Sequence, residues 1–270
     1  MASAGARRPE QPVMLMLGGQ AASGKSSART TSMRRLGADG GVIADFDGLL
    51  AYHPAYAELL AEDDRRASIL AGDDAFAWMN KLIDLAEEKR LNLLREGSMG
   101  GGAPERESLR FRRAGYRVEA DVMAVGEAVS RVANLERYQA MREQSGHGRL
   151  VATGIHDRAY AGIPRTLEAV DSRKILDEVR LHRWGGGLVY GNALGPSGEW
   201  RDRPRSPAAL RQERDRALTP AERDWIAAKL THLAARLPPE LLGQLPEIEA
   251  MARARGFRPG ARCEGSAELQ

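Results

Sequence analysis

The sequence contains a single cysteine, Cys263, among its 270 residues. An internal disulfide is therefore excluded, and a metal centre built on cysteine thiolates lacks its ligands. Aromatic residues make up only 5%, and neither sign of charge dominates, because 40 Lys and Arg face 37 Asp and Glu. A net charge of +3 gives little support for the concentrated basic surface that nucleic-acid-binding proteins use. We therefore expect no nucleic-acid partner.

Long apolar runs are also missing. No run approaches the roughly 20 residues that a membrane-spanning helix needs. The polar residues 1–12 are followed by an apolar segment, residues 13–17, that is too short for the core of a signal peptide. Hydrophobic residues still make up 43% of the chain, enough for a sizeable core. We expect a folded cytoplasmic protein without a membrane partner.

Short apolar segments alternate with helical patterns along most of the chain. The predicted strands are 13–17, 41–45, 91–94, 116–125 and 178–184. The predicted helices between them include 75–90, 105–113 and 127–143. Strands separated by helices imply right-handed crossovers and a parallel sheet with helices on both faces. The sequence therefore predicts an α/β fold.

Composition divides the chain into five segments. We expect a flexible N-terminus over 1–12 and the α/β core over 13–191. Glycine, proline and charged residues mark 192–207 as a linker or a long surface loop. A helical extension over 208–257 and a disordered tail over 258–270 follow. The extension contains three helical patterns, at 208–217, 220–236 and 239–255.

Directly after the first predicted strand, Gly19-Gln-Ala-Ala-Ser-Gly24-Lys25-Ser26 matches the P-loop pattern G-x-x-x-x-G-K-[ST] without a gap. Backbone N–H groups of such a loop surround the phosphates, the lysine reaches the β- and γ-phosphates, and the hydroxyl binds Mg²⁺. A chance Gly/Ser turn is the alternative, and the preceding strand argues against it. We expect ATP and Mg²⁺ here, with nucleotide contacts from Gly19, Gln20, Ala21, Ala22, Ser23, Gly24, Lys25, Ser26 and Ser27.

Two carboxylates, Asp45 and Asp47, lie at the end of the second predicted strand. The carboxyl ends of strands in an open parallel sheet line the ligand crevice, so both would face the phosphates. Asp45 could complete the Mg²⁺ shell with Ser26, and Asp47 could take a proton from an acceptor hydroxyl. A pair of carboxylates that caps a turn before Gly48 is an alternative of equal weight.

The order of these motifs resembles the zeta toxin family. Besides the P-loop, the resemblance rests on D-x-D-x-x-x-x-x-H-P at 45–54, Arg95-Glu96-Gly97-Ser98, Gly115-Tyr116, Arg137-Tyr138 and His156-Asp157. It runs from about residue 13 to residue 190. It implies a P-loop kinase that transfers the ATP γ-phosphate to the 3′-hydroxyl of UDP-N-acetylglucosamine. It also implies a small helical antitoxin that obstructs the ATP site.

The resemblance assigns roles to individual residues. Lys25 corresponds to the P-loop lysine and Asp47 to the general base. Glu96 corresponds to the acid that contacts the sugar nucleotide, and Ser98 keeps the hydroxyl of the residue that follows the E-G pair. These roles imply that Asp47, Glu96 and Ser98 bind the acceptor.

The resemblance also implies two lid arginines that reach the transferring phosphate. Arg149 corresponds to the first of them. Arg158 and Arg165 are both candidates for the second, and the sequence does not choose between them.

Two departures concern the acceptor. Leu50 and Met99-Gly-Gly-Gly102 replace basic residues that the family often has near its acceptor. A kinase for another hydroxyl compound, such as an antibiotic or a nucleoside, therefore stays open. A nucleotide-dependent switch or binding module is the alternative from a different functional class.

Overall fold

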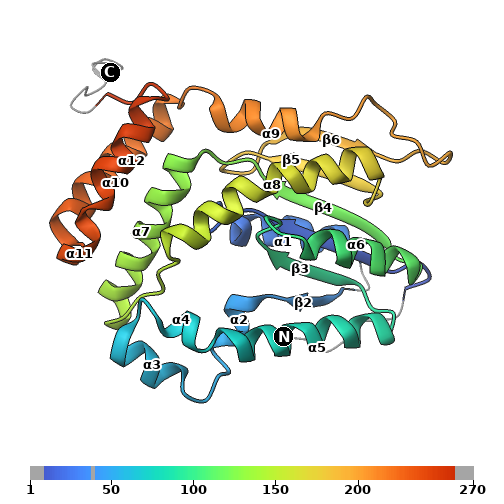
Figure 1. Ribbon diagram of the computed structural model, residues 1–270, viewed down its shortest axis with the longest axis horizontal. Helices are drawn as coiled ribbons and strands as arrows, with labels where there is room; N and C mark the ends of the chain where they lie inside the picture. The colour runs from blue at the N-terminus through green and yellow to red at the C-terminus, as the bar shows by residue number, and fades with distance from the viewer. Residues whose placement is uncertain (1–8, 38–39, 259–270) are drawn as a thin grey trace, which may run out of the picture.

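The computed structural model describes residues 9–37 and 40–258. Its sheet has six strands in the order β2-β3-β1-β4-β5-β6. They are β1 Val13–Gly18, β2 Val42–Ala44, β3 Leu93–Gly97, β4 Arg117–Met123, β5 Glu178–His182 and β6 Leu188–Ala193. The first five pair in parallel, and β6 runs antiparallel to β5 (Figure 1). The predicted α/β fold and all five predicted strands are confirmed.

Helices cover both faces of this sheet (Figure 1). They are α1 Lys25–Arg35, α2 Phe46–Leu50, α3 Tyr56–Asp63, α4 Ala67–Leu70, α5 Gly72–Glu88, α6 Ala103–Arg113, α7 Glu127–Ser145, α8 Thr153–Arg173, α9 Ser206–Asp215, α10 Pro220–Arg236, α11 Pro239–Leu242 and α12 Gln244–Arg253. Helix α1 packs on β1 and β3, α5 on β2 and β3, α6 on β4, and α9 on β5 and β6.

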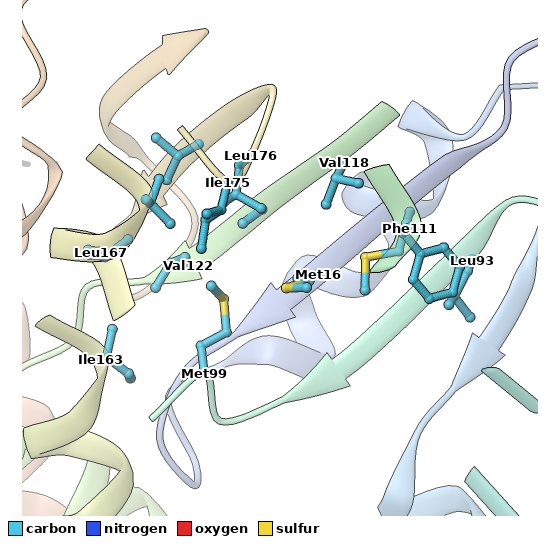
Figure 2. Packing of buried hydrophobic residues seen from close by; sticks show 14 of the residues in the cluster. Met16, Leu93, Met99, Phe111, Val118, Val122, Ile163, Leu167, Ile175 and Leu176 are labelled. Atoms are coloured by element: carbon cyan, nitrogen blue, oxygen red, sulfur yellow. The ribbon is translucent and has the colours of Figure 1, made fainter. Parts of the chain in front are cut away.

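The main apolar core lies on one face of the sheet. Side chains alternate between the two faces of a strand, so Met16 of β1 joins this core, whereas Leu15 packs on the α1 side. Figure 2 shows Met16 and Val122 among side chains from neighbouring helices, including Phe111 of α6 and Leu167 of α8. Four helices, α5, α6, α8 and α9, contribute to this core.

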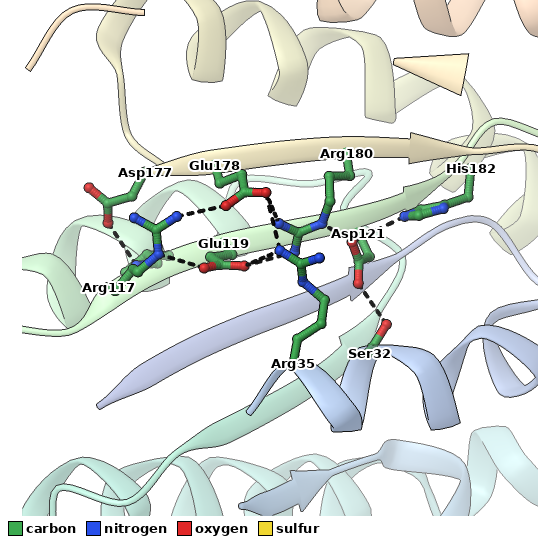
Figure 3. Close-up of polar contacts among 10 residues, drawn as sticks. Ser32, Arg35, Arg117, Glu119, Asp121, Asp177, Glu178, Arg180 and His182 are labelled. Atoms are coloured by element: carbon green, nitrogen blue, oxygen red, sulfur yellow. Dashed lines mark hydrogen bonds and ion pairs between the residues drawn. The ribbon is translucent and has the colours of Figure 1, made fainter. Parts of the chain in front are cut away.

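The opposite face of β4 and β5 carries charged side chains, which face α1 (Figure 3). Arg180 is buried and donates to Asp121 at 2.6 Å and to Glu119 at 2.8 Å. Ser32 of α1 donates to Asp121 at 2.7 Å. Burial raises the pKa of Asp121, but hydrogen bonds from His182, Ser32 and Arg180 outweigh it and hold that pKa well below its usual range. A hydrogen bond thus connects α1, the helix that follows the P-loop, to this part of the sheet.

The antiparallel strand β6 is absent from the predicted strands. Glycines at 185–187 form the turn after β5, and the strand that follows has a weak apolar pattern. Tyr190 and Asn192 are buried on it, whereas Leu188 is exposed. Strands are recognised in a sequence by the alternation of apolar and polar residues. This strand lacks that alternation, because one of its buried positions is an asparagine.

Residues 192–207, interpreted above as a linker, begin inside β6 and are tied to the core. The Trp200 indole N–H donates to the backbone carbonyl of Asp171 at 3.0 Å. The backbone N–H and hydroxyl of Ser206 donate to the Asp171 carboxylate at 2.8 and 2.7 Å. Helix α9, the first of the predicted extension, consequently lies on the sheet.

The rest of the extension groups beside α7. Helices α10 and α12 contact α7, and α11 contacts α12 (Figure 1). The helix predicted over 239–255 is divided into α11 and α12 at Gly243. Most of the predicted flexible N-terminus, 1–8, and of the disordered tail, 259–270, lies outside the described residues. In the part of the chain that the structure describes, no helix is long and apolar enough to cross a membrane.

Candidate active site

The P-loop connects β1 to α1. Gly24 has a φ of 90°, a left-handed conformation that favours glycine, and α1 begins at the next residue, Lys25. The Lys25 ammonium donates to the backbone carbonyls of Gly19 and Gln20 at 3.1 and 3.0 Å. Burial lowers the pKa of Lys25. The lysine therefore lies folded over its own loop, at the positive end of a helix where phosphate binds.

A cavity of about 750 Å³ lies beside the P-loop. The predicted site residues on its wall are Gly19, Ala21, Ala22, Ser23, Gly24, Lys25, Ser26, Asp45, Asp47, Glu96, Ser98 and Arg149. Of the predicted nucleotide contacts, Gln20 is fully buried and Ser27 lies on a second cavity instead. The fold thus brings together residues from the P-loop and the start of α1, from the ends of β2 and β3, and from the segment between α7 and α8.

Asp47 and Arg149 meet across this cavity. Asp47 lies in the first turn of α2, and the Arg149 guanidinium donates to its carboxylate. The Arg149 side chain is 16% exposed and that of Asp47 is 41% exposed, so both can reach a ligand in the cavity. In this arrangement the proposed lid arginine covers the proposed base.

Asp45 and Glu96 are joined by an arginine that the sequence reasoning did not assign. Arg29 donates to both carboxylates at 2.6 Å. The other oxygen of Asp45 accepts the backbone N–H of Asp47 at 3.1 Å and caps α2. Arg29 lies four residues after Lys25, so the two side chains share one face of α1. This spacing is the sequence signal that could have placed Arg29 at the site.

Glu96 is the more deeply buried of the two carboxylates. Its side chain is 8% exposed, against 14% for Asp45. Burial raises the pKa of Glu96, and the negative charge of Asp45 adds to that effect, whereas Lys25 and Arg29 oppose it. The carboxylate of Glu96 is thus held between two cations at the wall of the cavity.

Arg137 of α7 is a further cation on the cavity wall, and the sequence analysis gave it no role. Its guanidinium donates to Asn134 at 3.2 Å. Among the residues that the structure describes, it forms no ion pair. Burial and the nearby charge of Arg149 lower its pKa, whereas Asp47 and Glu96 raise it. An unpaired guanidinium in a cavity is suited to an anionic ligand.

Arg158 and Arg165, the candidates for the second lid arginine, lie elsewhere. Both are exposed on α8, and neither lines the cavity. The buried face of α8 carries Ile163, Leu167 and Val170, which pack into the core. The structure therefore does not bring either arginine to the site. Arg95 and Arg137 line this wall together with Arg149. Arg95 already forms an ion pair with Glu107 at 2.9 Å, so Arg137 is the better candidate for the second role.

A second cavity of about 620 Å³ lies on the other side of the loop. Gly24 lines both cavities. The remaining lining residues are Ser27, Ala28, Thr31 and Ser32 of α1, Asp121 and Met123 of β4, and His182, Trp184, Gly185 and Gly186 at the end of β5. Two spaces thus share the P-loop as a common wall.

The family model described as Zeta toxin matches residues 2–194, more than half of the 270-residue chain. The chain belongs to the zeta toxin family. It is 26% identical over 196 residues to Toxin zeta of Enterococcus hirae, which covers 72% of this chain and 68% of that protein. Zeta toxins are kinase-like phosphotransferases, so this family membership supports enzyme status for the chain.

Solved structures share the fold. A chain from the PezAT toxin–antitoxin system of Streptococcus pneumoniae has a TM-score of 0.70 at 20% identity, covering 87% of this chain and 91% of its own length. A chain from the AvrRxo1-ORF1:-ORF2 complex with ATP has a TM-score of 0.52 at 12% identity, covering 92% and 81%. At these identities the likeness concerns the fold alone.

In this zeta toxin family member, the glycine-rich turn after β3 packs against α8. An added Cβ on Gly100 would lie 2.6 Å from the Cα of Ala159, and one on Gly162 would overlap the carbonyl of Gly100. The Thr166 hydroxyl donates to the carbonyl of Met99 at 2.7 Å. Small residues are therefore required where this turn crosses the helix.

The cavity beside the P-loop has oxygen ligands that fit Mg²⁺. This ion usually keeps several waters and takes one or two carboxylates together with substrate phosphates. Ser26 offers an exposed hydroxyl on the cavity wall, and the hydrogen bonds of Glu96 with Arg29 all use one oxygen, Oε2. Asp45 is less available, because both of its oxygens accept hydrogen bonds.

Glu127, His156 and Asp157 also lie close enough together to suggest a metal centre. However, Arg131 lies among them, with its Nε 3.0 Å from Glu127 and its terminal nitrogen 2.9 Å from Asp157. Ser130 is hydrogen-bonded to His156 at 2.9 Å, and His156 to Asp157, so the three resemble the Ser-His-Asp triad of a hydrolase. Ser130 is fully buried, however, and no substrate can reach it. In this family member the group is an internal hydrogen-bond network.

Proposed function

We propose that this protein transfers the γ-phosphate of ATP to a hydroxyl of a UDP-sugar, and that it acts as the toxin of a toxin–antitoxin pair. The family resemblance implies UDP-N-acetylglucosamine as the acceptor. The observation that carries the proposal is the convergence of Lys25, Asp47 and Arg149 on one cavity beside the P-loop. Phosphoryl transfer depends mainly on positioning and on neutralising charge, and these side chains supply both.

The two cavities suggest how the substrates would be arranged. The cavity between α1 and the end of β5 offers the Trp184 ring and room for a nucleoside. The larger cavity holds the carboxylate of Asp47 and would receive the acceptor. Because Gly24 borders both spaces, the triphosphate would run along the loop between them. A chain in the solved AvrRxo1-ORF1:-ORF2 complex with ATP shares this fold, which supports ATP as the donor.

The chemistry then follows from the residues on the cavity wall. Asp47 would accept the proton of the attacking hydroxyl. Lys25, Arg137 and Arg149 would stabilise the negative charge on the transferring phosphate, because guanidinium groups bind phosphate oxygens in a planar fork. Ser26 would hold a magnesium ion together with the substrate phosphates, and the ion would supply neutralisation of their charge.

A second candidate acceptor is a hydroxyl compound without a diphosphate. Leu50 and Met99 occupy positions where basic residues are often found in the family, and both side chains are buried. Phe76 and Ile155, which line the acceptor cavity, are half exposed and apolar. These features favour an acceptor with less charge and more apolar surface.

The test is to incubate the purified protein and Mg²⁺-ATP with a panel of UDP-sugars and a panel of uncharged hydroxyl compounds. A mass gain of one phosphate on a UDP-sugar supports the first acceptor class, and a gain only on uncharged compounds supports the second. ATP turnover without any phosphorylated acceptor would contradict the kinase proposal and favour a switch.

The lid role of Arg149 leads to a separate prediction. Arg149→Ala should lower kcat by about 10²-fold, as when one donor to transition-state charge is removed. The KM for ATP should rise much less, because the arginine is proposed to bind charge that develops during transfer. Steady-state kinetics with both substrates varied would measure this.

Arg158→Ala is the matched control, because this arginine is exposed and lies off the cavity wall. It should leave both kcat and KM unchanged. If Arg158→Ala loses turnover and Arg149→Ala does not, the assignment of the lid role to Arg149 is wrong.

A further inference from the structure

The side chain of Gln20, the second residue of the P-loop motif, is fully buried behind the loop. Its amide nitrogen donates to the carbonyl of Val125 at 2.9 Å and to the Ser130 hydroxyl at 3.1 Å. Its backbone carbonyl accepts the Lys25 ammonium at 3.0 Å. Gln20 therefore connects the phosphate-binding loop to the start of α7.

The side-chain oxygen of Gln20 accepts a hydrogen bond from the C-terminal part of the chain. Arg214 of α9 donates to the Gln20 side-chain oxygen at 3.2 Å. Its guanidinium also donates to the carbonyl of Tyr160 at 2.9 Å and lies 3.9 Å from the centre of the Tyr160 ring. Arg214 is 194 residues away from Gln20 in sequence, yet it is part of the support of the loop.

Burying the charge of Arg214 is energetically unfavourable, and a purely structural contact would not need a charged residue. It is 5% exposed, and within the described residues no carboxylate forms an ion pair with it. Burial lowers its pKa to about 10. A buried cation that faces an amide and an aromatic ring lacks the compensation that buried charges usually have. Departures of this kind from packing rules are expected at functional sites.

We propose that Arg214 is a positioning residue for the P-loop, which it holds in its phosphate-binding shape through the side chain of Gln20. Helix α9 is then part of the nucleotide site, although it lies beyond residues 2–194, which the family model matches. The proposal rests on the nucleotide site of the proposed function. It predicts that changes at Gln20 and Arg214 affect ATP binding through one shared interaction.

The test is a double-mutant cycle on the full chain, read by calorimetric titration with ATP. Arg214→Ala and Gln20→Ala should each weaken ATP binding by about tenfold, within the range of coupled neighbours. The double variant should bind ATP about as weakly as either single variant. Arg214→Lys should be intermediate, because an ammonium cannot bond Gln20 and stack on Tyr160 in the same way.

Leu210→Ala is the matched control for loss of stability. Leu210 lies one turn before Arg214 on α9, is fully buried in the main core, and does not bond Gln20. This variant should unfold at a lower temperature and bind ATP like the wild type. If it weakens ATP binding as much as Arg214→Ala, general loosening of α9 explains the effect and the proposal fails.

Other outcomes are equally decisive. Folded Arg214→Ala protein with wild-type ATP affinity, or losses that multiply in the double variant, would overturn the positioning role. If Arg214→Ala does not fold, the comparison of Arg214→Lys with Gln20→Ala carries the test under the same expectations. Absence of ATP binding in the wild type would instead contradict the proposed function.

Discussion

Replacing Asp47 with asparagine is expected to lower kcat by about 10²–10⁴-fold, the loss typical of removing a general base. Asparagine keeps the size of the side chain and can still accept a hydrogen bond from Arg149, but it cannot take a proton. ATP affinity should change little, because Asp47 lies at the start of α2 on the acceptor cavity. Measurement of kcat and both KM values decides the matter.

Glu96→Gln is the matched comparison, since it removes the other carboxylate of the acceptor region by the same chemical change. Arg29 would keep its bond to Asp45, so the local structure should survive. If Glu96 holds the acceptor, its loss should appear mainly as a higher KM for the acceptor. Should Asp47→Asn retain most of its turnover while Glu96→Gln is inactive at saturating acceptor, Glu96 is the base.

Lys25→Ala is expected to abolish detectable phosphate transfer while the protein stays folded. Among the described residues, the ammonium of Lys25 donates only to the carbonyls of its own loop, and Lys25 is not part of the apolar core. In the presence of ATP this group would turn to the phosphates, whose charge no other loop side chain can match. A coupled kinase assay and calorimetric titration with ATP would measure the loss.

Thermal unfolding provides the control for Lys25→Ala. Burial lowers the pKa of Lys25, which means that folding disfavours the charged form of this side chain at neutral pH. The alanine variant should therefore unfold at the same or a slightly higher temperature. A large drop in the unfolding temperature, or full kinase activity, would contradict the assignment.

Much of the fold follows from local signals in the sequence. Residues 13–17 form a continuous apolar run that ends in glycine, and this pattern identified β1 and the P-loop together. The cap Thr219 and the proline after it placed α10 at its observed bounds, Pro220–Arg236. Signals of this kind depend only on neighbours along the chain, so they can be read without the tertiary structure.

The parts that sequence reasoning missed depend on contacts between distant elements. Arg137 reaches the cavity because α7 crosses beside the P-loop. The pair Arg137-Tyr138 supports the family resemblance, but the sequence does not show that the arginine faces the ligand. Arg158 and Arg165 stay outside because packing turns the other face of α8 to the core, with Gly162 against Gly100. Charged residues are frequent in this chain, so their type alone does not indicate which of them face a ligand.

The bond between Arg149 and Asp47 has a consequence for the order of events in a catalytic cycle. While the guanidinium covers the carboxylate, an acceptor that arrives alone finds its base occupied. A triphosphate on the loop offers Arg149 a more highly charged partner, and its departure frees Asp47. The donor would then have to bind before the acceptor, which initial-rate kinetics can recognise as a compulsory-order pattern; a random-order pattern would exclude it. A sugar or other alcohol would meet an active base only in molecules already loaded with nucleotide.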